Sequence, residues 1–136
     1  MIEHSHPIKV YYKDIDKMGI VYYSRYFEYF EESRTELLAS IGLQITNVEQ
    51  EGVMLPVISS HCDFKKGAQF EDVILIKSWV NERPRSTLKI SYRVVLKKTN
   101  DLLATGYTIH AFVNSLGKPI KPPKSILAYM QKYLKK

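Results

Sequence analysis

One stretch of helical periodicity, Ser24 to Ile41, most constrains how this 136-residue chain can fold. Its apolar side chains recur every three or four residues, and its glutamates fall mostly on the other side of the helical wheel. The Ser24 hydroxyl can cap the first turn, and Gly42 can end the helix in the left-handed conformation. The pattern predicts an amphipathic helix whose buried face carries Phe27, Phe30, Leu37, Leu38 and Ile41.

The rest of the chain alternates mainly with the period of β-strands. Residues 72–81 are apolar on both alternate sets, so that strand should be covered on both faces. One long helix beside an antiparallel sheet is an α+β arrangement. The second face of such a sheet would be too apolar for water, which predicts a homo-oligomer. The expected strands are 8–12, 53–64, 72–81, 88–96 and 102–114, and a short helix with Ile126, Tyr129, Met130 and Tyr133 ends the chain.

The length fits one domain, residues 1–136, with no room for a second. No apolar run approaches the roughly 18 residues that a membrane span needs, and the first residues lack the apolar core of a signal peptide. The single Cys62 cannot form an internal disulfide and is interpreted as a small buried hydrophobe. These features predict a soluble cytoplasmic protein.

The formal charge of +6 could suggest a nucleic-acid partner, but its distribution argues against one. No acidic residue follows Asp101, so the excess of positive charge belongs to the last part of the chain. Lysines near the end of a helix complement its dipole and form a solvated face. We therefore expect no nucleic-acid binding from Lys118, Lys121, Lys124, Lys132, Lys135 and Lys136.

The candidate catalytic residues lie just before the long helix, where Asp14 and Asp16 are followed by Gly19. A carboxylate, a glycine turn and a helix N-terminus lie within ten residues there, and exposed helix N–H groups can polarise a carbonyl. The spacing also fits the start of a calcium loop. That alternative fails because position five would be Met18 and position twelve Arg25, where calcium needs oxygen ligands.

Residues 14–34, from Asp14 to Arg34, resemble the signature of hot-dog-fold acyl-CoA thioesterases of the 4-hydroxybenzoyl-CoA thioesterase type. Residues 64–72 are similar to the family's entry into its central strand, and the order of predicted strands is the hot-dog order. The resemblance implies an antiparallel sheet of about five strands wrapped around one long helix. It also implies hydrolysis of acyl-CoA at sites formed between the subunits of a homodimer or homotetramer. We expect no cofactor, and no constellation of metal ligands is visible in the sequence.

Carried over position by position, the resemblance makes Asp16 the nucleophile or general base. It assigns the polarising backbone N–H to Tyr23, where many relatives carry histidine. The hairpin residues Arg83 and Arg85, with Ser86, would bind the nucleotide of coenzyme A. Gly67 replaces a frequent proline, which predicts a looser loop beside the acyl pocket.

Other interpretations remain open for the same residues. Asp16 could serve only to stabilise a turn, as we expect of Asp14, and the two arginines could be solvated hairpin residues. His61 and His110 are interpreted as satisfied polar residues of the core. For the whole protein, the rivals are an acyl-carrier-protein thioesterase and a non-catalytic protein that binds acyl ligands.

Overall fold

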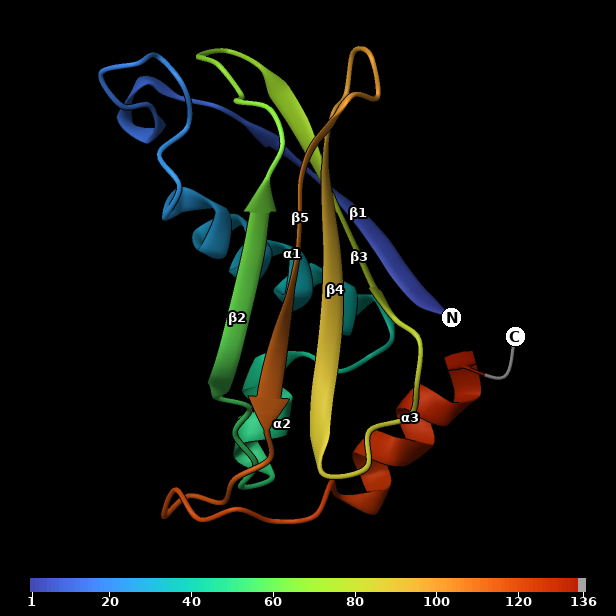
Figure 1. Ribbon diagram of the computed structural model, residues 1–136. Coiled ribbons are helices and arrows are strands. Elements are labelled where there is room, and N and C mark those ends of the chain that lie inside the picture. The colour runs from blue at the N-terminus through green and yellow to red at the C-terminus, as the bar shows by residue number, and fades with distance from the viewer. Residues whose placement is uncertain (135–136) are drawn as a thin grey trace.

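The computed structural model describes residues 1–134 (Figure 1). One five-stranded antiparallel sheet is combined with one long helix, two short helices and a 3₁₀ turn. This is the α+β hot-dog arrangement that the sequence predicts. The elements in chain order are β1 (Ile2–Lys9), η1 (Tyr12–Asp14), α1 (Arg25–Ser40), α2 (Ile45–Gln50), β2 (Val57–Phe64), β3 (Val73–Val80), β4 (Thr87–Leu96), β5 (Leu102–Ala111) and α3 (Lys124–Leu134).

The strands lie in the order β1-β3-β4-β5-β2, so β1 and β2 form the two edges of the sheet. The predicted first strand, 8–12, was wrong in its position. β1 instead begins at Ile2 and pairs with β3 along its whole length, from Ile2 opposite Val80 to Lys9 opposite Val73. Two of its inward side chains, His4 and His6, are polar, so alternation of apolar residues does not reveal this part of the strand.

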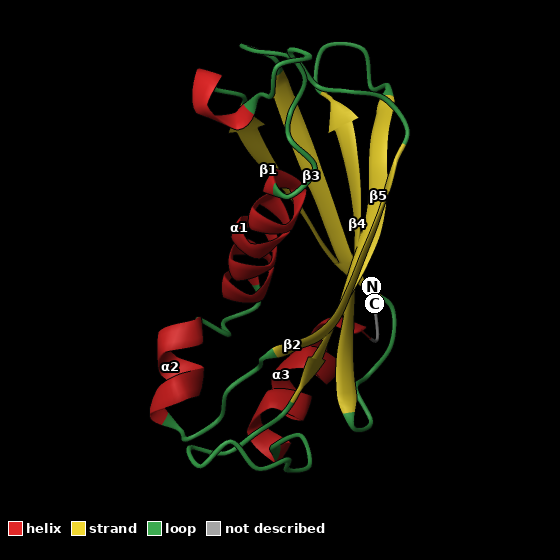
Figure 2. Ribbon diagram, turned by 60° about the vertical axis from the view of Figure 1, so that its left-hand side comes forward, coloured by secondary structure: helices red, strands yellow, loops and turns green. Residues whose placement is uncertain are grey.

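Helix α1 crosses one face of the sheet, mainly over β1 and β3 (Figure 2). Its buried face starts with Tyr26, whereas Phe27, predicted to be buried, is 36% exposed. The buried set follows the helical period through Ser33, whose hydroxyl donates to the Ile76 carbonyl at 3.3 Å. Counting only aliphatic and phenylalanine side chains therefore placed the face slightly off its true position. Its buried members are Tyr26, Tyr29, Phe30, Ser33, Leu37 and Leu38.

The predicted cap at Ser24 is absent, because Ser24 already has helical dihedral angles and its side chain makes no capping hydrogen bond. The first turn is closed by backbone groups instead: the N–H of Arg25 donates to the Tyr22 carbonyl and that of Tyr26 to the Tyr23 carbonyl. At the other end, Gly42 follows the helix with a φ of +87°, as predicted.

The face of the sheet away from α1, which we call the outer face, is less apolar than the sequence suggested. On β3 the inward side chains are fully buried, but the outward ones are half-buried in the single chain. Lys77 and Arg93 lie next to each other on this face, between neutral Ser5 and Thr105. Exposed apolar side chains gather instead along the edge strand β2, where Val57, Ile58 and Phe64 are each at least 43% exposed.

Helix α3 buries Ile126 and Met130, as its pattern predicts, and Lys124 and Lys132 are exposed on it. Two of the lysines assigned to a solvated face, Lys135 and Lys136, lie outside the described residues. None of the helices in the described part of the chain has the length and apolarity that a bilayer crossing requires.

Candidate active site

The Asp16 carboxylate lies inside the turn that leads from η1 toward α1. Its Oδ1 atom accepts the backbone N–H of Met18 at 2.8 Å and that of Ile20 at 3.4 Å. Gly19 completes the turn with a φ of +80°, which glycine adopts without steric cost. The Oδ2 atom accepts no hydrogen bond from any residue in 1–134. One carboxylate oxygen is therefore held by the turn, and the other is free to contact a ligand.

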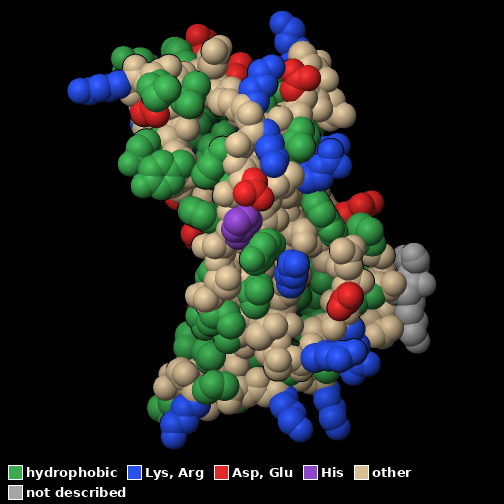
Figure 3. All heavy atoms as spheres, in the orientation of Figure 1, with side chains coloured by type: hydrophobic (Ala, Val, Ile, Leu, Met, Phe, Trp, Pro, Cys, Tyr) green, Lys and Arg blue, Asp and Glu red, His purple; other side chains and the backbone are tan. Residues whose placement is uncertain are grey.

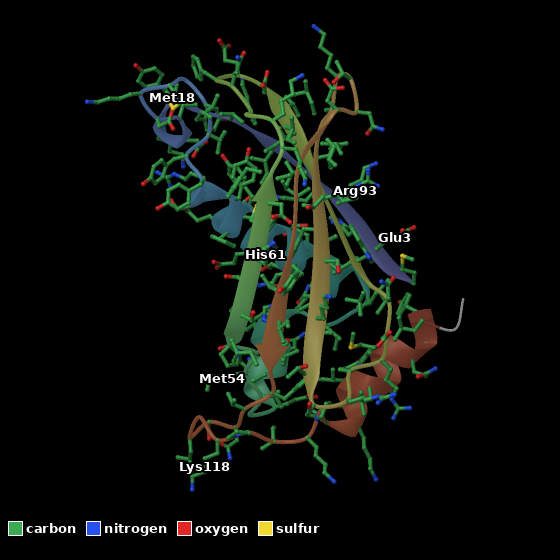
Figure 4. The ribbon with its side chains drawn as sticks, in the orientation of Figure 1. Glu3, Met18, Met54, His61, Arg93 and Lys118 are labelled. Atoms are coloured by element: carbon green, nitrogen blue, oxygen red, sulfur yellow. The ribbon has the colours of Figure 1, made fainter. Side chains whose placement is uncertain are left out.

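A cavity of about 310 Å³ lies against this carboxylate. Its walls come from the Asp16 turn, the entry into α1 and the loop after β2, and these loops lie side by side at the upper left of Figure 1. A hydrogen bond of 2.9 Å from the Val21 N–H to the Ala68 carbonyl joins them. Met18, labelled in Figure 4, marks the exposed tip of the turn. Most of the wall is apolar or aromatic, as is usual for cavities that bind small molecules.

Aromatic rings form one side of this cavity. The ring of Phe64 meets that of Tyr26 edge to face, with centroids 5.2 Å apart, and that of Tyr23 at 6.4 Å. Burial raises the pKa of Tyr26 to about 12, so its hydroxyl stays protonated at neutral pH. The sequence did not identify Phe64 as a site residue, because it lies 48 positions beyond Asp16 and only the folded chain brings the two together.

The start of α1 contributes backbone N–H groups beside the same cavity. The N–H groups of Tyr23 and Ser24 find no hydrogen-bond acceptor among residues 1–134. Such groups carry the positive end of the helix dipole. Tyr23 also lines the cavity. The pKa of Tyr22 is raised, mainly by its side-chain hydrogen bond with Tyr23, and the negative charge of Asp16 adds to the rise.

Gly67 packs directly against Ile20 on the floor of the cavity. A Cβ atom added to Gly67 would lie 2.6 Å from Ile20 Cγ2, which is closer than side chains approach in proteins. The resemblance predicted that glycine here loosens the loop. The structure gives a different reason for it: without a side chain, the loop after β2 can approach the Asp16 turn closely.

Asp14 differs from Asp16 in its surroundings. It is only 5% exposed, its Oδ2 atom accepts the Tyr11 N–H at 2.9 Å, and its Oδ1 atom lies 3.8 Å from Arg25 Nε. Its backbone carbonyl also accepts the Tyr22 N–H at 2.9 Å. Burial raises the pKa of Tyr29, and the Asp14 charge adds to the rise. These contacts support a structural role for Asp14.

Arg83, Arg85 and Ser86 lie in the hairpin between β3 and β4, around a cavity of about 450 Å³. This hairpin is at the lower end of the molecule in Figure 1, whereas the Asp16 turn is at the upper end. A single chain therefore does not bring the predicted nucleotide-binding residues to the predicted catalytic residue.

Residues 10–130 match the family described as the thioesterase-like superfamily. The chain belongs to that superfamily. It is 31% identical over 127 residues to the acyl-CoA thioesterase YbgC of Haemophilus influenzae, covering 91% of each chain. Its structure is similar to that of hypothetical protein TT1821 from Thermus thermophilus, with a TM-score of 0.88, 31% identity and 96% of each chain covered. It is also similar to a DHNA-CoA thioesterase from Staphylococcus aureus, with a TM-score of 0.89, 26% identity, and 99% of this chain and 91% of the other covered.

Membership in the thioesterase-like superfamily makes the chain a hot-dog-fold thioester hydrolase, as the sequence predicted. Cys62, the single cysteine of the sequence, is a poor nucleophile. Cys62 is half-buried, and burial raises the pKa of its thiol to about 11, so little thiolate exists at neutral pH. Among the described residues, no group of three or more His, Cys, Asp or Glu side chains could hold a metal ion.

The two histidines that were interpreted as core residues, His61 and His110, differ in their surroundings. His110 is buried, with Nδ1 donating to the Leu55 carbonyl at 3.1 Å and Nε2 bonded to Thr108 at 2.8 Å, so it is the satisfied core residue that was predicted. The same prediction was wrong for His61, which lies exposed on edge strand β2 (Figure 4). Its ring stacks on that of Tyr107, its cross-strand partner on β5.

Proposed function

We propose that this chain hydrolyses acyl-CoA thioesters with the Asp16 carboxylate and the Tyr23 backbone N–H. One observation carries the proposal: a carboxylate with a free oxygen and a helix N-terminus with a free N–H border the same largely apolar cavity. The first group supplies a base or nucleophile, and the second supplies a donor for a developing oxyanion. The similarity to the acyl-CoA thioesterase YbgC of Haemophilus influenzae agrees with it.

Two routes use these groups. In one, Asp16 attacks the thioester carbonyl and the C–S bond breaks, giving a mixed anhydride and CoA thiolate, and water then hydrolyses the anhydride. In the other, Asp16 removes a proton from water as that water attacks the carbonyl, and the thiolate leaves from the tetrahedral intermediate. Both routes place negative charge on the carbonyl oxygen, where the Tyr23 N–H would stabilise it.

The separation of Asp16 from Arg83 and Arg85 is resolved if two chains share each site. Edge strand β2 carries exposed apolar side chains and unpaired backbone groups, a surface suited to pairing with another strand. Two copies of β2 paired antiparallel about a twofold axis would set the start of one strand beside the end of the other. The hairpin end of one chain would then lie on the side of the partner's Asp16 turn. We therefore propose a homodimer, alone or paired again into a tetramer.

A carrier-protein thioester is the alternative substrate. Arg83 and Arg85 form no ion pair with other residues in 1–134, so an acidic carrier protein could also use them. Acyl-CoA is favoured because the two arginines surround a hollow of ligand size rather than a flat surface.

The proposal is tested by thiol release from a panel of acyl-CoA thioesters and from the same acyl groups on acyl carrier protein. We expect acyl-CoA to be hydrolysed with the higher kcat/KM. Preference for the carrier-linked substrates would favour the alternative. Tight binding of acyl-CoA without turnover of any substrate would favour a non-catalytic acyl-binding protein.

A further inference from the structure

A cavity of about 750 Å³ lies on the outer face of the sheet, away from Asp16 and Tyr23. It is formed over β1, β3 and β4, and its walls include Glu3, Ser5, Lys77, Trp79 and Arg93. Figure 4 labels two of them, Glu3 beside β1 and Arg93 beside β4. We call this hollow the outer-face cavity.

Two cations lie directly opposite each other in this cavity. Lys77 on β3 is the cross-strand partner of Arg93 on β4, and both point to the outer face. Like charges at directly opposed positions destabilise a sheet. The next residues in the same row, Ser5 and Thr105, are neutral, and neither cation forms an ion pair with any residue in 1–134. The arrangement favours a bound anion, which would relieve the repulsion.

The outer-face cavity adjoins the hairpin cavity of Arg83 and Arg85, because Asn81 lines both. Together they hold five cationic side chains and two carboxylates. Figure 3 looks onto this face, where Lys and Arg side chains recur from the middle of β4 down to the hairpin. The cations are Lys77, Arg83, Arg85, Lys89 and Arg93, and the carboxylates are Glu3 and Glu82.

Trp79 adds a different kind of contact to this positive surface. It is the only tryptophan of the chain, is half-buried, and lies two residues from Lys77 on the same face of β3. Aromatic side chains stack on nucleobases, whereas cations alone suffice for inorganic phosphate. A tryptophan beside opposed cations therefore fits a phosphorylated nucleoside better than a simple anion.

From this arrangement, we propose that the outer-face cavity binds the phosphorylated adenosine end of coenzyme A, with Trp79 against the adenine and Lys77 and Arg93 on phosphate. The inference rests on the proposed acyl-CoA substrate and extends its binding site beyond the hairpin. It adds three specificity-determining residues for the nucleotide: Lys77, Trp79 and Arg93.

The test uses the single tryptophan as the reporter. The protein is titrated with CoA, adenosine 3′,5′-bisphosphate, pyrophosphate and pantetheine while Trp79 fluorescence is recorded. CoA and the bisphosphate should quench it, and pantetheine should not. The double variant Lys77→Ala/Arg93→Ala should bind CoA about tenfold more weakly. Lys98→Ala, which removes an exposed lysine from the β4–β5 turn, is the matched control and should bind as the wild type does.

A misfolded variant is recognised by its melting temperature. Because removing opposed like charges relieves repulsion, the double variant without ligand should melt at or above the wild-type temperature, and CoA should raise its melting temperature less. The ratio of kcat/KM for acyl-CoA to that for the matching acyl-pantetheine should fall about tenfold in this variant.

Two results would overturn the inference. One is CoA binding, seen by calorimetry, that leaves Trp79 fluorescence and the affinity of the double variant unchanged. The other is equal quenching by pyrophosphate and the bisphosphate, which would remove adenine from the site. Failure of the proposed function looks different: no thioester would be hydrolysed, whether or not CoA quenches Trp79.

Discussion

The Asp16 Oδ1 atom lies 2.8 Å from the backbone nitrogen of Met18, two residues further along the same turn. This contact means that Asp16 supports the turn whatever else it does. An asparagine at position 16 can accept the same N–H through its amide oxygen, but it carries no negative charge. The structural and the chemical roles of Asp16 can therefore be separated by one substitution.

Asp14→Asn should lower stability more than turnover. The Asp14 carboxylate is buried against Arg25 and the Tyr11 N–H, and the substitution removes its charge while leaving Arg25 in place. We expect the free energy of unfolding to fall by about 1 to 2 kcal/mol. Denaturant melts measure that loss, and kcat on the folded variant serves as the control. A variant with normal stability and strongly reduced kcat would assign Asp14 to the chemistry.

Arg83→Ala combined with Arg85→Ala should raise KM for acyl-CoA and change kcat little. Phosphate contacts far from the carbonyl stabilise the bound substrate and the transition state alike. Added salt should mimic the double substitution, because it screens exposed charges. If an acyl-pantetheine substrate, which lacks the nucleotide, suffers the same loss, the hairpin arginines have a structural role.

The protein should be a dimer or a larger oligomer at micromolar concentration, as light scattering will measure. Strand β2 exposes apolar Val57 and Ile58 at 43% and 59%. A charge at the second position, Ile58→Lys, should oppose pairing of two such edges and shift the protein toward monomer. Thioesterase activity should fall with the loss of the dimer. A strictly monomeric and fully active wild type would refute the shared site.

His110 should make stability depend on pH. Burial lowers the pKa of His110 to about 4, whereas unfolded histidine titrates near 6.5. Between these values the unfolded chain binds the proton more readily, so the contribution is fully present above pH 6.5 and is lost as pH falls toward 4. The loss amounts to about 3 kcal/mol over that range. The free energy of unfolding is measured against pH for the wild type and for His110→Gln, which cannot titrate. Between pH 6.5 and 4 the wild type should lose about 3 kcal/mol more than the variant; parallel plots would exclude His110 as the cause.

The sequence predicted the elements whose period is regular. The spacing in α1 and the alternation in β4 come from single elements with one buried face, so local pattern suffices for them. It misplaced β1, where His4 and His6 take inward positions, and it assigned a buried role to Phe27. Both errors come from not counting side chains of mixed polarity, the two histidines in β1 and Tyr26 in α1, whose burial depends on the element packed above them.

The candidate site was predicted only in part, for a similar reason. Asp16 and Tyr23 are close in sequence to the helix start, so their proximity follows from a local turn. The part played by Phe64 and the close approach of Gly67 to Ile20 arise from a loop distant in sequence. The distance between Asp16 and the hairpin arginines depends on which end of the sheet each loop occupies, and spacing along the chain does not encode that.

The central claim is that Asp16 performs the chemistry. It is tested most directly by the kcat of Asp16→Asn for acyl-CoA hydrolysis, measured together with the melting temperature. We expect kcat to fall by roughly a hundredfold or more, the scale of general acid–base catalysis, with the melting temperature almost unchanged because the Met18 hydrogen bond is kept. A folded Asp16→Asn variant that hydrolyses acyl-CoA at a near-wild-type rate would contradict the claim.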